Sequence, residues 1–93
     1  MVRIKEYKLR PQTVEAIEFT GHNVDEVRRF LGDSYFHATD EWVKFEGGGR
    51  EEICCDRWEY IVKYYVKGWG TTFTCMTEDE LHYAYEEVNA SEQ

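Results

Sequence analysis

The chain has 93 residues and a formal net charge of −8, with 16% aromatic and 32% charged residues. This length allows one domain with a modest core, and the aromatic content argues against a disordered chain. The acidic balance disfavours direct nucleic-acid binding, and no apolar run reaches the roughly 20 residues that a membrane-spanning helix needs. We therefore expect a single domain over residues 1–93 that does not enter a membrane, with residues 89–93 forming a frayed tail.

Short β-branched and aromatic runs, separated by turn residues, predict strands along most of the chain. These expected strands cover residues 2–9, 13–19, 34–38, 42–46, 51–55, 58–66 and 71–76. The longest alternation, WEYIVKYYVK, puts Trp58, Tyr60, Val62 and Tyr64 on one side, and we expect this side to be the core face. Gly68-Trp69-Gly70 then provides the flexible connection of a long hairpin.

Two helices are expected, each with an apolar stripe that must pack on the sheet to be stable. Asn23 is a good N-cap for a helix over residues 23–31. Thr77 and Glu80 have the spacing of a capping box for a second helix over residues 77–88. The expected fold is therefore α+β, with an antiparallel sheet of about five to seven short strands and two short helices.

The three cysteines, Cys54, Cys55 and Cys75, are an odd number in a chain whose start does not resemble a signal peptide. This pattern predicts a reducing, cytoplasmic environment. The histidines show no paired spacing with the cysteines of the kind that zinc sites use. We therefore expect buried or half-buried thiols, with no bound metal and no cofactor.

Several motifs resemble those of a family of small phage and prophage proteins of uncharacterised function. That family has a basic first strand, a P-V-x-V-E-A-I-Q-F-like strand, a G-D-Y/W-I-V-K hairpin and a final helix ending T-Y-E-E-V. The matching stretches here are PQTVEAIEFTG (residues 11–21), EYIVK (residues 59–63), VKG (residues 66–68), Phe73, Cys75 and YEEV (residues 85–88). The chain departs from the pattern at Trp58-Glu59 and at Trp69-Gly70, which lengthens the hairpin tip. The resemblance implies a phage-encoded protein in the host cytoplasm, and it carries no assigned catalytic residues.

The leading hypothesis is a non-enzymatic phage accessory protein that binds and blocks a host protein. An inhibitor of bacterial defence, of the anti-CRISPR kind, would occlude a basic site on a nucleic-acid-binding partner by steric and electrostatic means. Trp69, between two glycines, would be the hydrophobic anchor. The acidic side chains that would face the basic patch are Glu78, Asp79, Glu80, Glu86 and Glu87. A solvated acidic helix face and a tip folded over the sheet are the alternatives.

Two other functions stay open. The first is sequestration of a nucleotide by aromatic stacking and basic clamping. Its candidate residues are Arg57, Lys63, Tyr65, Lys67 and Trp42. The second is a structural or assembly role in the phage particle. Self-association is also open. No enzymatic activity is expected, because the paired acidic residues are sequence neighbours on exposed-looking segments.

Overall fold

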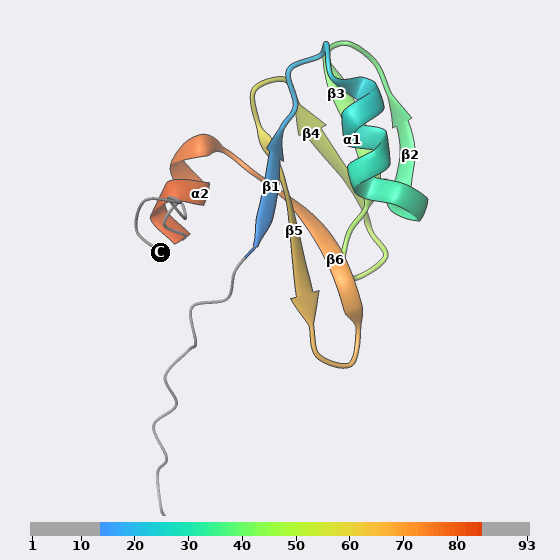
Figure 1. Cartoon of the computed structure of the whole chain (residues 1–93), viewed down its shortest axis with the longest axis vertical. Coiled ribbons are helices and arrows are strands. Elements are labelled where there is room, and N and C mark those ends of the chain that lie inside the picture. The colour runs from blue at the N-terminus through green and yellow to red at the C-terminus, as the bar shows by residue number, and fades with distance from the viewer. Residues whose placement is uncertain (1–13, 85–93) are drawn as a thin grey trace, which may run out of the picture.

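The computed structural model describes residues 14–84, which form six strands, two α-helices and one short 3₁₀ turn (Figure 1). The elements in chain order are β1 (Glu15–Glu18), α1 (Val24–Leu31), the 3₁₀ turn (Gly32–Ser34), β2 (Tyr35–Ala38), β3 (Trp42–Glu46), β4 (Glu52–Asp56), β5 (Tyr60–Val66), β6 (Gly70–Met76) and α2 (Glu78–Ala84). The expected α+β class and number of strands are confirmed. The strand expected over residues 2–9 and the end of the second helix lie outside the described residues.

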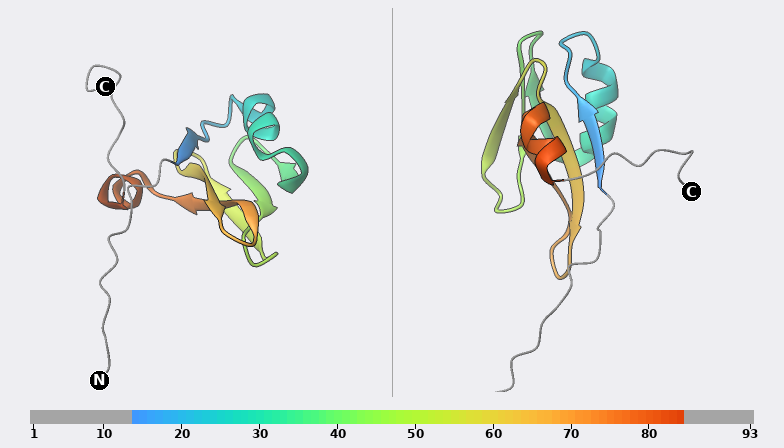
Figure 2. Two further views of the ribbon diagram at one scale, coloured as in Figure 1. Left: turned by 60° about the horizontal axis from the view of Figure 1, so that its bottom comes forward. Right: turned by 90° about the vertical axis from the view of Figure 1, so that its left-hand side faces the viewer.

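The six strands divide into two antiparallel sheets of three strands each, where the sequence had predicted one sheet. The orders are β1-β5-β6 and β2-β3-β4, and Figure 2 shows the two sheets as separate layers. In the first sheet Ala16 lies opposite Val62, and Val62 lies opposite Thr74. The long hairpin therefore has β1 on one side only, and β4 approaches β6 from the other sheet without joining its ladder.

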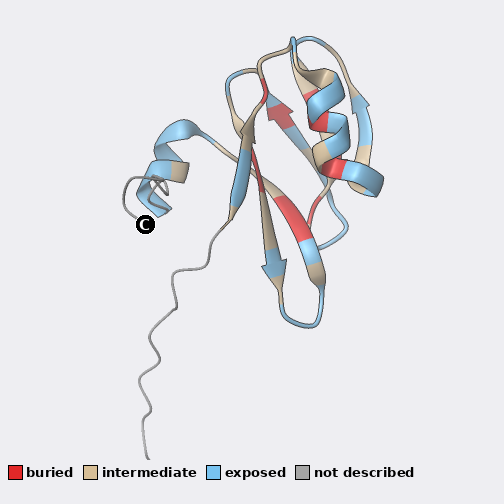
Figure 3. Ribbon diagram, viewed as in Figure 1, coloured by how far each residue is buried: buried red, intermediate tan, exposed pale blue. Residues whose placement is uncertain are grey.

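The core lies between the two sheets and α1 (Figure 3). Phe73 on β6 contacts Phe45 on β3, with ring centroids 6.5 Å apart, and Phe30 on α1, at 5.8 Å. From α1, Val27 and Leu31 are buried, as the predicted apolar stripe requires. The buried residues of this cluster are Phe19, Val27, Leu31, Val43, Phe45, Cys55, Ile61 and Phe73.

The expected core face of the hairpin was wrong. Trp58 lies in a turn with φ of 76° and is 59% exposed, so it precedes the strand and points away from the core. Ile61, from the opposite side of β5, belongs to the core cluster, while Val62 is also fully buried. β5 is the central strand of its sheet and is covered on both faces, so alternation alone could not indicate which face meets the second sheet.

Asn23 precedes α1 but makes no side-chain cap on it, contrary to the prediction. Its Oδ1 instead accepts hydrogen bonds from the Thr20 amide at 3.0 Å and the Thr20 hydroxyl at 3.2 Å. Its Nδ2 donates to the carbonyl oxygen of Glu18 at 2.7 Å. Asn23 thus stabilises the loop between β1 and α1, a use of asparagine that competes with helix capping.

Within residues 14–84, no helix is long and apolar enough to span a membrane.

Candidate functional site

The tip of the β5–β6 hairpin presents aromatic side chains to solvent. Gly68 and Gly70 adopt φ of 90° and 86°, and the Trp69 amide donates to the carbonyl oxygen of Val66 at 2.9 Å. This turn leaves Trp69 69% exposed, and Tyr65 on the adjoining strand is 60% exposed. The alternative of a tip folded over the sheet is excluded by this exposure.

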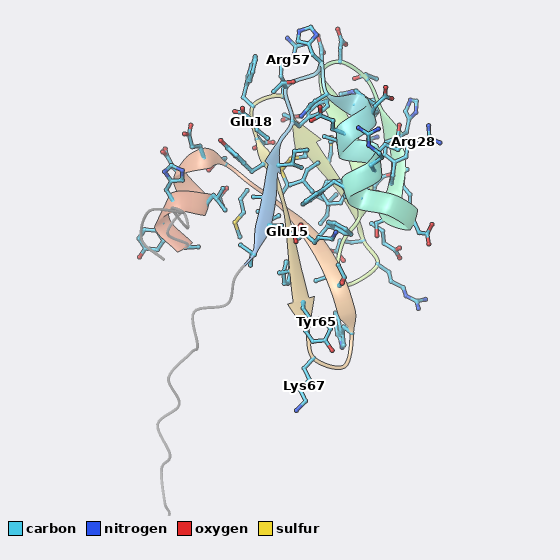
Figure 4. All side chains as sticks on the ribbon, in the orientation of Figure 1. Glu15, Glu18, Arg28, Arg57, Tyr65 and Lys67 are labelled. Carbon is cyan, nitrogen blue, oxygen red and sulfur yellow. A yellow bond between two sulfur atoms is a disulfide. The ribbon has the colours of Figure 1, made fainter. Side chains whose placement is uncertain are left out.

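Lys67 shares the tip with Tyr65, and Figure 4 shows both side chains at the far end of the hairpin. Tryptophan and tyrosine are both enriched in protein interfaces, so an exposed tryptophan beside an exposed tyrosine is typical of a contact surface. The tip is therefore a candidate contact surface, and we refer to Tyr65, Lys67 and Trp69 as the tip cluster.

The first turn of α2 gathers three acidic residues at the other end of β6. Glu78, Asp79 and Glu80 are all exposed, and none of the residues of α2 is buried. The predicted capping box is present: the Thr77 amide donates to Glu80 Oε1 at 2.9 Å, and the Glu80 amide donates to Thr77 Oγ1 at 3.1 Å. Hydrogen bonding of the Glu80 carboxylate by the Thr77 amide, and to a smaller extent by the Thr77 side chain, lowers the pKa of Glu80, so the carboxylate is stabilised in its charged form.

The structure does not bring the acidic turn and the tip cluster together. The seven residues of β6, Gly70–Met76, separate Trp69 from α2, and a strand advances about 3.3 Å per residue. α2 also stands apart from both sheets in Figure 2. A partner would need to extend along the length of β6 to meet both surfaces. Glu86 and Glu87 lie outside the described residues.

The residues predicted for nucleotide binding are likewise divided among separate places. Arg57 follows β4 and donates from Nε and Nη2 to the carbonyl oxygen of Asp40, at 2.9 and 2.7 Å. Trp42 lies on β3, with Lys44 Nζ 4.8 Å from its ring centroid. Figure 4 shows Arg57 at the opposite end of the molecule from Tyr65.

Lys63 and Tyr65 do come together, on the wall of an open hollow of about 330 Å³. The other residues that line this hollow are Glu15, Tyr64 and Thr71. Lys63 Nζ lies over the rings of Phe30 and Phe73, at 5.1 and 5.9 Å from their centroids. The hollow thus holds one ammonium group, which already contacts the core aromatics, and one carboxylate.

Sequence reasoning missed a cluster of three residues where the two sheets meet. Cys55 on β4 and Cys75 on β6 form a disulfide with Cα atoms 5.6 Å apart, so the expectation of three thiols was wrong for this pair. Glu59 Oε1 lies 3.6 Å from Cys75 Sγ. The alternation that places Phe45 and Phe73 in the core also points Cys55 and Cys75 inward, and this signal could have predicted the pair.

Cys54 is the exposed neighbour on the outer face of β4 and keeps its thiol. Partial desolvation and the negative charge of Asp56 raise the pKa of the Cys54 thiol, so it is a weaker nucleophile at neutral pH than an ordinary cysteine.

Comparisons of the chain with protein-family models, curated proteins and solved structures found no match.

Proposed function

We propose that this chain is a non-enzymatic phage accessory protein that binds a host protein through the hairpin tip and blocks its action. The observation that carries the proposal is the exposure of Trp69, which is 69% accessible at the end of a two-stranded hairpin. Exposing a large apolar ring is unfavourable in water, and a binding partner that covers it recovers hydrophobic free energy. Inhibition of a bacterial defence system in the host cytoplasm, as by an anti-CRISPR protein, is the role that the phage resemblance suggests.

The acidic first turn of α2 supports a partner with a basic surface. Its carboxylates point into solvent and are therefore accessible to Lys and Arg side chains of another protein. A defence protein that binds nucleic acid has such a basic surface and would be occluded without any chemical step. Charge at this distance from Trp69 contributes mainly to the rate of association, while the tryptophan contributes to the lifetime of the complex.

Two tryptophans at opposite ends of β5 provide a matched test of the anchor. Trp69→Ala and Trp58→Ala each remove an exposed indole, at 69% and 59% accessibility. Both variants and the wild type, tagged, are used for quantitative capture from host lysate. We expect wild type and Trp58→Ala to capture similar amounts of one specific host protein. Trp69→Ala should capture at least tenfold less of it. Capture that is unaffected by Trp69→Ala would show that the tip is not the anchor.

The acidic turn is tested by charge reversal that spares the capping box. Glu78→Lys and Asp79→Lys leave Thr77 and Glu80 intact, and the control reverses Asp25 and Glu26 in the first turn of α1. We expect the α2 pair, but not the α1 pair, to slow association with the captured partner and to weaken its salt dependence. Equal effects of the two pairs would indicate a general charge effect and no local contact.

Inhibition itself is measured in cells that carry an active CRISPR system. Expression of the protein should restore the efficiency with which a targeted phage forms plaques, and Trp69→Ala should abolish this effect. Binding without restored plaque formation would separate the contact from the inhibitory role.

Nucleotide sequestration is the second candidate, and the hollow beside Lys63 and Tyr65 is the observation that favours it. Calorimetric titration with ATP and with a cyclic dinucleotide tests it. Binding that is lost on Lys63→Gln and kept on Arg57→Gln would locate the ligand in the hollow, because Arg57 lies against Asp40 at a distance from it. No heat of binding with either nucleotide would remove this candidate.

A further inference from the structure

Cys55, Cys75 and Glu59 place two sulfur atoms and one carboxylate oxygen within 4.8 Å of one another. We propose that these residues bind one thiophilic divalent cation, of which Zn²⁺ is the clearest case, when the Cys55–Cys75 disulfide is reduced. The site would connect the two sheets through a metal ion in place of the covalent bond. This inference is independent of the hairpin tip and of the function proposed for it.

The three donors come from three segments that the fold holds in place. Cys55 is on β4 and fully buried, and Cys75 is on β6 opposite Ile61 of the central strand. Glu59 belongs to the turn between β4 and β5, where its carbonyl oxygen accepts a hydrogen bond from the Phe19 amide at 2.9 Å. Bringing these donors together needs no change of fold, because β4, β6 and the turn are already adjacent.

The carboxylate of Glu59 is also oriented before any ion arrives. The Asp56 amide donates to Glu59 Oε1 at 2.7 Å, and the Glu59 amide donates to the Asp56 carbonyl oxygen at 3.0 Å. The second bond closes the turn and the first holds the side chain over it, with Oε1 3.6 Å from Cys75 Sγ. Outer hydrogen bonds of this kind orient metal ligands and increase their affinity.

The chemistry of the donor set favours zinc over the common oxygen-seeking cations. Two thiolates are soft ligands that select Zn²⁺ over Mg²⁺ or Ca²⁺, and a carboxylate is a frequent third zinc ligand. Cys55 is buried, and Cys75 and Glu59 are half-buried, so the three negative charges of two thiolates and one carboxylate would be neutralised in large part by a bound divalent cation. Zinc is usually four-coordinate, so a water molecule would complete the site.

The disulfide and the metal exclude each other. A dithiol reductant transfers two electrons and two protons to the Cys55–Cys75 bond, which yields two thiols and the disulfide of the reductant. Zn²⁺ then displaces one proton from each thiol and forms two zinc–sulfur bonds. Oxidation by a disulfide reagent reverses the sequence: the two zinc-bound thiolates transfer two electrons to the reagent, which takes up two protons and leaves as two thiols, while the Cys55–Cys75 bond re-forms and Zn²⁺ is released.

The test uses the full chain in both redox states. The protein is reduced with dithiothreitol, freed of reductant without oxygen, and titrated with Zn²⁺ against a chromophoric chelator. We expect one equivalent of Zn²⁺ to bind the reduced chain and none to bind the disulfide form. Titration with Co²⁺ should give thiolate-to-metal charge-transfer absorption only in the reduced chain. A reduced chain that binds no Zn²⁺, whether folded or unfolded, overturns the proposal.

Two variants that keep the disulfide partners identify the ligands. Cys54→Ser removes the exposed thiol next to Cys55 and should leave zinc affinity unchanged. Glu59→Gln keeps an oxygen that can accept from the Asp56 amide but removes the charge, and should weaken zinc binding by roughly tenfold or more. Glu52→Gln, at an exposed position of β4, is the matched control and should have no effect. Loss of binding in Cys54→Ser, or wild-type affinity in Glu59→Gln, would rule out the proposed ligand set.

Discussion

Cys55 and Cys75 connect two sheets that share no ladder in residues 14–84. Their strands, β4 and β6, approach each other at the core, and the disulfide closes a sequence separation of 20 residues. The bond encloses the turn after β4 and nearly all of the β5–β6 hairpin. It therefore restrains the segment that carries the tip cluster.

Breaking this bond should lower the stability of the whole domain. For a loop of this length the loss of chain entropy in the unfolded state corresponds to about 3 kcal/mol. Urea denaturation of Cys75→Ser, with a chelator present to exclude metal, should show a correspondingly lower free energy of unfolding than wild type. Cys54→Ser should unfold like the wild type, and equal midpoints for all three chains would contradict the prediction.

Gly21 should not tolerate a side chain. Its φ is 86°, and a Cβ atom at this position would collide with the carbonyl oxygen of Asp40, which accepts two hydrogen bonds from Arg57. Gly21→Ala should therefore destabilise the domain by more than about 1 kcal/mol. Gly68→Ala is the control for backbone strain alone, because Gly68 has a similar φ of 90° and open space around it. Denaturation midpoints should fall further for Gly21→Ala than for Gly68→Ala.

The capping box should stabilise α2 locally and not the domain. Thr77→Ala removes the hydroxyl that accepts from the Glu80 amide, a loss that typically weakens a helix by about 1 kcal/mol. Because no residue of α2 is buried, the helix adds little to the core. Hydrogen exchange of the α2 amides should accelerate several-fold, while the global unfolding midpoint stays within error. A large fall in that midpoint would show that α2 supports the sheets.

The same box should make α2 sensitive to acid. The pKa of Glu80 is lowered in the folded state by its hydrogen bonds with Thr77, so the folded helix binds this proton more weakly than the unfolded segment does. Helix stabilisation by the carboxylate is present above the unfolded pKa and is lost as pH falls through the folded pKa. NMR titration should show the Glu80 carboxyl changing at lower pH than an unpaired glutamate, with α2 amide protection falling in the same range. Glu80→Gln should remove that pH dependence.

Local signals in the sequence were sufficient for most of the elements. The spans of β3 and α1 and the capping box of α2 depend on neighbours within a few residues, and the sequence contains those neighbours. Asn23 shows the limit of such signals, since the residue suits a helix cap but its side chain bonds to Thr20 and Glu18. Asparagine can form either hydrogen-bonding pattern, and here the Asn23 side chain binds the loop after β1 in place of the first turn of α1.

The candidate site could be predicted only in part. Two glycines around Trp69 indicated a flexible tip, but whether the ring folds over the sheet depends on what covers that sheet. The sequence also places Trp69 and the acidic turn at the two ends of one strand, and the structure shows that no bend brings them together. Glu59 had no local signal, because its position beside the two sulfur atoms depends on how β4 and β6 pack against the turn.

The sequence by itself determined the α+β class, the hairpin, the helices and the acidic surface, because periodicity, turn residues and caps act over a few residues. The tertiary structure decided how the strands divide into two sheets, which face of β5 meets the core, and that Cys55 meets Cys75 beside Glu59. These features depend on register between strands far apart in the chain, and that register is set by packing of the whole core.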